Sequence, residues 1–182
     1  IFKGFQWLDD HEDASDRCVV YLTTHGFPIG LDLPPIDEED GTDEALMSYW
    51  GFAYPNCIVT DDEINFWLNR LESEGVCVIV DSCDAGGVDD PPDWGIQSVQ
   101  SMSKEDWMQG FAEELKAQGR VVLMASCEDE VSYSGGFAPY LIDGMKGYAD
   151  SNQDGIITAE EVFVYAEPRT TRQSPTIYDN YP

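Results

Sequence analysis

The sequence predicts an α/β fold with a mostly parallel central sheet, because three short apolar runs alternate with segments of helical periodicity. The runs cover residues 18–23, 76–80 and 121–125. Each run is rich in β-branched residues and almost continuously apolar, which is typical of strands that are buried on both faces. Strands that alternate with helices favour a parallel sheet with right-handed crossovers.

Apolar residues at helical spacing predict four helices, over residues 61–74, 103–118, 137–148 and 158–166. The first has Thr60 as an N-cap, acids in its first turn and Gly75 just past its end. Two long stretches, residues 26–56 and 86–102, interrupt the alternation, and loops of this length are usually functional or mobile. The tail beyond Pro168 has no periodicity, so we expect it to cross the domain as an extended strap.

The charge balance excludes several classes of partner. Over 182 residues, 9 Lys and Arg stand against 36 Asp and Glu, a net charge of -27. Nucleic-acid binding needs a basic stripe, an anionic membrane surface would repel this chain, and no apolar run approaches the length of a membrane span. Cations, or substrates that carry Lys or Arg, are favoured partners instead. Five cysteines without C-x-x-C spacing argue against a disulfide framework and a zinc site.

Reactive residues stand at the ends of the first two predicted strands. His25 and Gly26 follow the first strand, while Cys83 follows the second and precedes glycines 86–87. Ligands of an open parallel sheet bind beyond the carboxyl ends of its strands. A cysteine nucleophile needs a neighbouring base, and flanking glycines leave backbone N–H groups available to an oxyanion. The pattern favours a Cys-His pair, although a structural role for His25 stays open from spacing alone.

Around these residues the chain resembles the caspase-like cysteine peptidases, specifically the metacaspase and orthocaspase branch. The resemblance rests on residues 21–26 (YLTTHG) and 80–87 (VDSCDAGG), with further similarity at residues 7–9, 40–46, 60–63, 125–127 and 173–179. It implies a caspase-hemoglobinase fold, a three-layer sandwich in which residues 1–182 form the catalytic domain. The family fold begins with a strand and a helix, which we expect upstream of Ile1.

The resemblance also implies a role for each residue of the candidate site. His25 would be the general base and Cys83 the nucleophile of a cysteine endopeptidase, and the backbone N–H groups of Gly26 and Cys83 would form the oxyanion hole. Asp81 would line the S1 pocket and bind Arg or Lys at P1, so the expected partners are proteins or peptides with a basic P1 residue. The alternative role for Asp81 is to cap the following turn. We expect a monomer.

Two departures from the family pattern keep other functions open. Thr24 stands where Gly or Ser is common, and Asp84 places an acid beside the nucleophile, which opposes thiolate formation. One alternative is therefore a catalytically weak or inactive caspase-like module that binds calcium or regulates other proteins. A second is a caspase-clan peptidase of other specificity, legumain-like or separase-like.

Residues 150–161 match the twelve-residue calcium loop of an EF-hand. The ligand positions are occupied by Asp150, Asn152, Asp154, the carbonyl group of Ile156, Thr158 and Glu161. Gly155 stands at the turn position, and a helix is predicted to follow. We predict that this loop binds Ca²⁺; the alternative is an acidic loop that only caps the helix.

The resemblance implies a second calcium site. Metacaspases bind an activating calcium through four acids, which map to Asp40, Asp61, Asp62 and Asp90. The alternative is that these acids are solvated residues of loops and of a first helical turn. No signal peptide is visible, so the sequence assigns no compartment.

Overall fold

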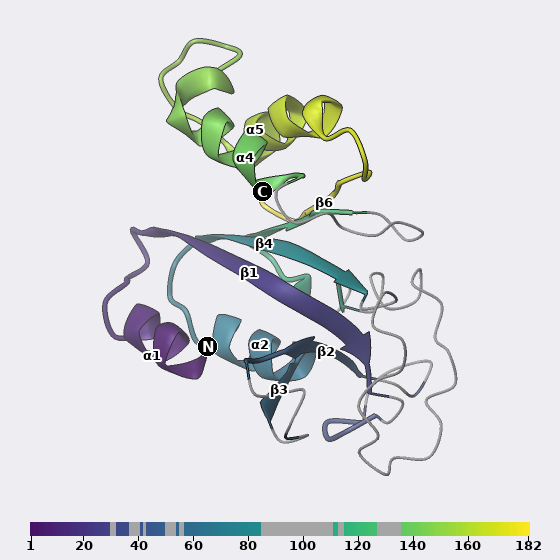
Figure 1. The fold of residues 1–182 in the computed structure, drawn as a ribbon. Helices are drawn as coiled ribbons and strands as arrows, with labels where there is room; N and C mark the ends of the chain where they lie inside the picture. Colours follow the sequence, from purple (N-terminus) through teal and green to yellow (C-terminus); the bar gives the residue numbers. More distant parts are fainter. Residues whose placement is uncertain are drawn as a thin grey trace.

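The chain adopts an α/β fold with one six-stranded sheet and helices on both of its faces (Figure 1). The structure, a computed structural model, describes residues 1–29, 32–36, 41, 43–49, 54, 57–84, 111–112, 115–126 and 136–182, with only the backbone at Pro28, Cys83 and Asp84. The strands are β1 (Arg17–Pro28), β2 (Glu44–Met47), β3 (Ile58–Thr60), β4 (Gly75–Asp84), β5 (Arg120–Met124) and β6 (Thr176–Asp179). The helical elements are α1 (Phe2–Asp9), α2 (Asp61–Leu68), α4 (Ala138–Asp143), η2 (Gly144–Tyr148), α5 (Ala159–Ala166) and η3 (Glu167–Arg169).

The sheet is mixed, with the strand order β3-β2-β1-β4-β5-β6. Its centre follows the prediction, because β1, β4 and β5 are parallel neighbours. These three strands contain the three apolar runs of the sequence, except for Ala125, which follows the end of β5. The outer strands differ: β2 is antiparallel to β1, β3 to β2 and β6 to β5. The carboxyl ends of β1 and β4 therefore meet at one edge of the molecule, where the candidate site lies.

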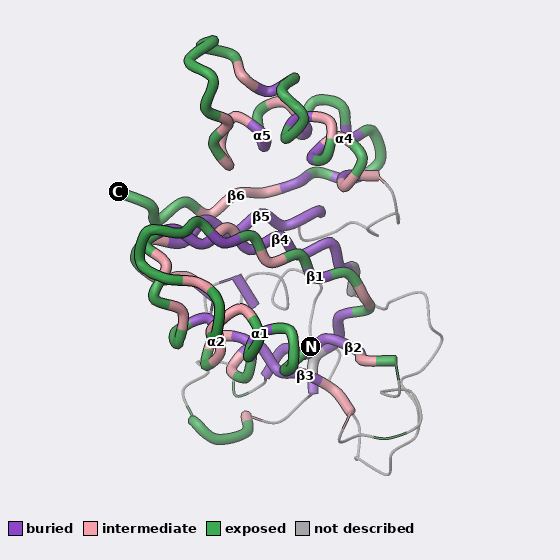
Figure 2. The backbone as a smooth tube through the Cα atoms, turned by 90° about the vertical axis from the view of Figure 1, so that its left-hand side faces the viewer, coloured by how far each residue is buried: buried purple, intermediate pink, exposed green. Residues whose placement is uncertain are grey.

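The helices cover the two faces of the sheet and produce two apolar cores. Helices α1 and α2 cover one face, where Leu22, Ile64 and Val78 belong to one cluster. Helices α4 and α5 cover the other face, where Ile79 and Phe163 belong to a second cluster. Figure 2 shows that β4 and β5 are largely buried between these layers, as their apolar runs predict.

Strand β1 is buried on one face only. On the α1/α2 face, Cys18 and Leu22 are 6% and 8% exposed, whereas Val19 and Tyr21 on the other face are 58% and 44% exposed. This period-two alternation continues to His25, which is exposed near the end of the strand. The layer formed by α4 and α5 thus leaves one row of β1 side chains accessible to solvent.

Two predicted helices differ in length or shape from the sequence pattern. Helix α2 begins at Asp61 after its Thr60 N-cap but ends at Leu68, although Leu71 still packs against the core. The segment 137–148 forms α4 and η2, with Gly147 at a positive φ of 116°. Of the predicted helix 103–118, the described part contains Phe111, Ala112 and Leu115, which are helical and buried.

Several elements were not predicted. Helix α1 precedes the first strand, and the stretch 26–56 contains the end of β1 and all of β2. The tail predicted to be an extended strap instead forms η3 and then β6, which extends the sheet beside β5. The stretch 86–102 lies outside the described residues. Within the ranges that are described, the helices are too short or too polar to cross a membrane.

Candidate functional site

Strands β1 and β4 bring His25 and Cys83 to the same level of the sheet. The two strands are parallel, and the Cα atom of His25 pairs with that of Cys83, just as Thr23 pairs with Asp81. Neighbouring strands lie about 4.8 Å apart, so the two positions are adjacent in space although 58 residues (83 − 25) separate them in the sequence. The His25 side chain is exposed, while the Cys83 side chain lies outside the described part of the chain.

Asp81, the predicted S1 residue, is a buried carboxylate with an identified hydrogen-bond donor. Asp81 is 7% exposed, and its Cα atom pairs with that of Thr23 on β1. The Tyr21 hydroxyl donates a hydrogen bond of 2.6 Å to Oδ2 of Asp81. Burial, reinforced by the hydrogen bond and the negative charge of Asp81, raises the pKa of Tyr21 to about 12, so the phenol stays a donor at neutral pH. Sequence analysis missed Tyr21, which the period-two alternation places on the same face as His25.

The residues around the predicted oxyanion hole connect β1 to both neighbouring strands, β2 and β4, through strand pairing and hydrogen bonds. Gly26 is buried and pairs with Leu46 of β2 on one side and with the backbone of β4 on the other. The Thr24 hydroxyl donates to the Met47 carbonyl, and the Ser82 hydroxyl donates to the Thr24 carbonyl at 2.8 Å. Thr24, a departure from the family pattern, therefore joins the ends of three strands.

The loop 150–161 has the internal hydrogen bonds of a tight, ordered turn. The N–H group of Gly155 donates to Oδ2 of Asp150 at 3.2 Å, and that of Asp154 donates to Oδ1 of Asn152 at 2.8 Å. The N–H group of Ile156 donates to Oδ1 of Asp154 at 2.8 Å. Gln153 and Gly155 have positive φ angles of 61° and 82°, which direct these donors toward the preceding side chains.

Glu161 closes this loop against the start of α5. Its Oε1 accepts from the N–H and hydroxyl groups of Ser151 at 3.3 and 3.0 Å, and its Oε2 accepts from the N–H group of Thr158 at 3.3 Å. At the other end of the loop, Oδ1 of Asp150 is buried with no hydrogen-bond partner. Asp150 and Glu161, the predicted ligand positions one and twelve, are thus both held by hydrogen bonds from backbone groups of the loop.

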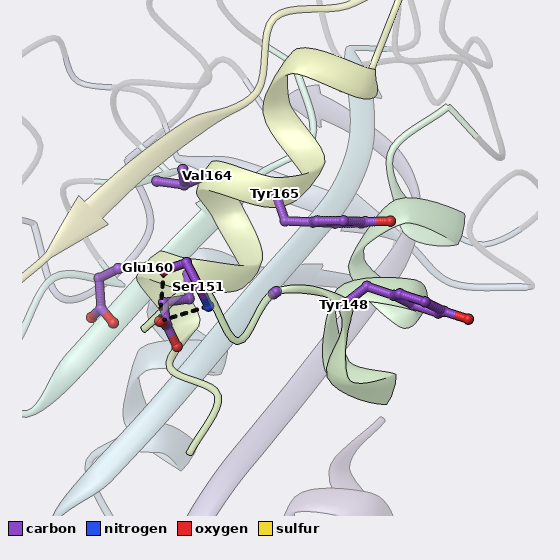
Figure 3. A pocket seen from close by; sticks show the side chains of 7 residues that line it. Tyr148, Ser151, Glu160, Val164 and Tyr165 are labelled. Carbon is purple, nitrogen blue, oxygen red and sulfur yellow. Dashed lines mark hydrogen bonds between the residues drawn. The ribbon is translucent and has the colours of Figure 1, made fainter. Parts of the chain in front are cut away.

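A cavity of about 340 Å³ lies beside this loop (Figure 3). It is lined by Tyr148, Ala149, Ser151, Glu160, Glu161, Val164 and Tyr165. Figure 3 shows the rings of Tyr148 and Tyr165 on one side, with Glu160 and Ser151 on the other. Arg169 already lies over the Tyr165 ring, 3.8 Å from its centroid, so one face of this ring has a cationic neighbour within the chain.

Asp61, one of the predicted ligands of the second calcium site, belongs to a buried acidic cluster. Asp61, Asp43 and Glu44 are 0%, 0% and 1% exposed. Asp61 shares a hydrogen bond with Glu44, which requires a proton on one of the two carboxyl groups, and its Oδ2 is buried without a hydrogen-bond partner. The interpretation of Asp61 as a solvated first-turn acid is therefore wrong, whereas Asp62 is half-buried.

The electrostatics of this acidic cluster follow from its burial. Desolvation, together with the negative charge of Asp43, raises the pKa of Asp61 to about 7, although hydrogen bonds from Glu44 and from the N–H group of Asp62 oppose the shift. Asp40 and Asp90 lie outside the described residues. Asp43 and Glu44 were not among the predicted site residues, and their signal is a pair of acids at the start of the apolar strand β2.

The described ranges contain no three His, Cys, Asp or Glu side chains that are already arranged to hold one metal ion. The loop 150–161 also contains oxygen atoms of another kind, the amide oxygen of Asn152 and the backbone carbonyl oxygen of Ile156. The hard oxygen atoms of the loop fit Ca²⁺ in type, and the buried Oδ1 atom of Asp150 accepts no hydrogen bond from the protein.

Comparisons with known proteins bear on the fold alone. No model of a protein family matches the chain, and no curated protein matches it. A solved structure, the crystal structure of protein GSU0716 from Geobacter sulfurreducens, is similar with a TM-score of 0.59 at 17% sequence identity. The match covers 100% of this chain and 73% of that chain. This chain thus shares its overall α/β arrangement with a known structure.

Proposed function

We propose that the protein is a cysteine endopeptidase of caspase-like fold, in which His25 is the general base and Cys83 the nucleophile. The observation that carries the proposal is the pairing of these two residues at the carboxyl ends of adjacent parallel strands. This is the edge of an α/β sheet at which ligands bind. Asp81, buried two residues before Cys83, supplies a negative charge for a basic P1 side chain.

The proposed reaction proceeds in two steps. His25 takes the proton of the Cys83 thiol, and the sulfur atom attacks the carbonyl carbon of the scissile peptide bond. The backbone N–H groups of Gly26 and Cys83 stabilise the oxyanion, and His25 then gives its proton to the leaving amine. Water, activated by His25, hydrolyses the resulting thioester and releases the acid product with a free thiol.

Reporter peptides that differ only at P1 test this proposal. We expect hydrolysis after Arg and Lys, and a loss of at least about 1,000-fold in kcat/KM for Cys83→Ala, because the nucleophile is removed. Cys77→Ala is the matched control on the same strand. Burial, with a smaller effect of the Glu160 charge, raises the pKa of Cys77 to about 12, so this thiol stays protonated at neutral pH.

Other outcomes of the same assay identify the alternatives. Equal signals from the wild type and Cys83→Ala would reject the peptidase and leave the inactive calcium-binding module. Cleavage after Asn would indicate a legumain-like specificity and would reject the S1 role of Asp81. A preference for Asp at P1 would also contradict the basic specificity.

A second proposal is that residues 150–161 bind Ca²⁺. The hydrogen bonds inside the loop already position Asp150, Asn152 and Asp154, and Glu161 lies at the opposite end of the loop. Bound calcium would supply positive charge that holds these oxygen atoms together. Asp61 and Asp62 are the described members of the second predicted site, and Asp61 is buried together with Asp43 and Glu44.

Isothermal titration of chelator-treated protein with CaCl₂ measures both calcium sites. Two sites are expected if the loop and the acidic cluster both bind, and one if only the loop does. Absence of binding at millimolar calcium would reject both. This measurement does not depend on peptidase activity, so the two proposals fail or hold separately.

A further inference from the structure

The exposed row of β1 contains a residue that acts on the candidate S1 carboxylate. We propose that Tyr21 is a positioning residue that fixes the plane of the Asp81 carboxylate and thereby favours Arg over Lys at P1. The inference deepens the proposed peptidase function and rests on it. Tyr21 itself is not placed among the reacting groups.

The geometry joins Tyr21 directly to Asp81. Tyr21 pairs with Ile79 along the strands, and its ring extends toward the carboxyl end of the sheet to reach Oδ2 of Asp81 at 2.6 Å. Thr23 is the Cα partner of Asp81 and lies two residues beyond Tyr21 in the exposed row of β1. Tyr21 is 44% exposed, whereas Asp81 is 7% exposed, so Tyr21 is the more accessible of the two hydrogen-bonded residues.

The hydrogen bond from Tyr21 to Asp81 is strong and persists over the pH range of a peptidase assay. A hydroxyl that donates to a charged carboxylate forms a short, charge-assisted hydrogen bond. The elevated pKa of Tyr21, about 12, keeps its proton in place at any pH at which a cysteine peptidase is assayed. The carboxylate orientation is therefore constrained without any contribution from titration of the phenol.

A carboxylate with a fixed plane discriminates between the two basic side chains. The guanidinium group of Arg is planar and binds carboxylates through two parallel N–H donors, so it depends on the orientation of its partner. The ammonium group of Lys is a compact charge with rotatable donors and tolerates a carboxylate that turns. Removal of the Tyr21 hydroxyl should consequently weaken Arg binding more than Lys binding.

Steady-state kinetics of Tyr21→Phe on matched peptides with Arg, Lys or norleucine at P1 test this inference. We expect KM to rise roughly tenfold for Arg and about threefold for Lys, with no change for norleucine and with kcat within about twofold throughout. Tyr181→Phe is the matched control, because Tyr181 is 40% exposed and lies beside Arg17 at the opposite end of the sheet. Its kinetic constants should equal those of the wild type.

A double-mutant cycle with Asp81→Asn separates positioning from a structural effect. In the Asp81→Asn background, Tyr21→Phe should no longer change the ratio of kcat/KM between Arg and Lys substrates. Thermal unfolding checks that each variant is folded.

Three results would overturn the inference: an equal rise in KM on all three peptides, an unchanged ratio of kcat/KM between Arg and Lys substrates, or an effect of Tyr21→Phe that persists in the Asp81→Asn background. If the wild type is as inactive as Cys83→Ala, the peptidase proposal falls and this inference with it; an active wild type with an unselective Tyr21→Phe overturns this inference alone.

Discussion

Helices α2 and α5 begin with the same local structure and differ in the acids around their first turns. Thr60 and Thr158 are the N-caps, and each accepts a hydrogen bond from the N–H group of a Glu three residues later, at 3.1 and 3.2 Å. At α2, Asp61 is fully buried together with Asp43 and Glu44 from the start of β2, whereas Asp62 is half-buried and Glu63 is exposed. Around α5 they come from one stretch of the sequence and none is fully buried: Asp154 is exposed, while Asp150, Glu160 and Glu161 are half-buried.

This difference shows that one capping motif can serve two electrostatic environments. Exposed acids near a helix N-terminus are solvated and interact favourably with its dipole. Buried acids lose hydration and repel one another, so they take up protons or require a cation. The buried acidic cluster at α2 should therefore depend on pH and metal, whereas the loop at α5 should depend on its local geometry.

The largest expected effect comes from the acidic cluster, through Asp61→Asn in the presence of chelator. The pKa of Asp61 is about 7 in the folded protein against 3.8 for a free carboxyl group, so between these values the folded state binds a proton that the unfolded state has released. The wild type must then lose stability as pH rises through this range. Urea unfolding should show that the free energy of unfolding of Asp61→Asn, relative to that of the wild type, increases by about 2 kcal/mol from pH 5.5 to pH 8.

Asp62→Asn is the control for this experiment, since Asp62 is the half-buried neighbour in the same helical turn. Asp62→Asn should change the free energy of unfolding by only about 0.5 kcal/mol. A wild type that is more stable than Asp61→Asn at pH 8 without metal would contradict the electrostatic account of the acidic cluster.

Asp150→Asn tests the loop at α5 through its calcium affinity. The change removes one negative charge from the first ligand position and weakens the acceptor for the Gly155 N–H group. We expect the Kd for calcium at this site to rise at least about tenfold in isothermal titration. Asp143→Asn, which removes an exposed ion pair with Lys146, should leave the affinity unchanged. Identical affinities for both variants would place calcium binding elsewhere.

Gly155→Ala tests how far the loop depends on its backbone. Gly155 has a φ of 82° with nothing within 4 Å of an added Cβ atom, so the cost is conformational and not steric crowding by neighbours. Thermal unfolding in chelator should show a loss of about 1–2 kcal/mol. The same substitution at Gly4, inside α1 and also without neighbours within 4 Å, should be neutral or stabilise by up to about 1 kcal/mol. Equal effects at both positions would contradict this account.

The smallest effects compare the two caps directly. Thr60→Ala and Thr158→Ala should each cost about 1 kcal/mol of unfolding free energy, because each leaves a helix N–H group without its side-chain acceptor. Thr60 is 7% exposed whereas Thr158 is exposed, so water replaces the lost acceptor less well at Thr60. Chemical denaturation should therefore rank Thr60→Ala as the more destabilising; the reverse order would remove the contrast between the two helices.

The features that could be predicted from the sequence are the local ones. The three parallel strands, the Thr60 cap and the hydrogen-bonded loop at 150–161 depend on residues near one another in the chain. The end of α2 at Leu68 was missed, because Leu71 continues the apolar period while packing outside the helix.

The features that could not be predicted depend on how distant segments meet. The burial of Asp43 and Glu44 with Asp61 follows from the pairing of β2 with β3, which places the start of α2 beside the start of β2. Likewise, the alternation along β1 indicates on which face Tyr21 lies, but its bond to Asp81 requires the register between β1 and β4. The short edge strand β6 has no alternation to mark it in the sequence.

The one-sided burial of β1 separates two kinds of evolutionary change. Substitutions at Cys18 or Leu22 alter the packed interior and act on folding. Substitutions at Val19, Tyr21 or Thr23 alter the accessible row that leads to His25, and those at Tyr21 also alter its hydrogen bond to Asp81. A library randomised at these three outward positions can therefore vary the surface beside His25 without repacking the core under α1 and α2, which makes this strand a natural starting point for redesigning the protein.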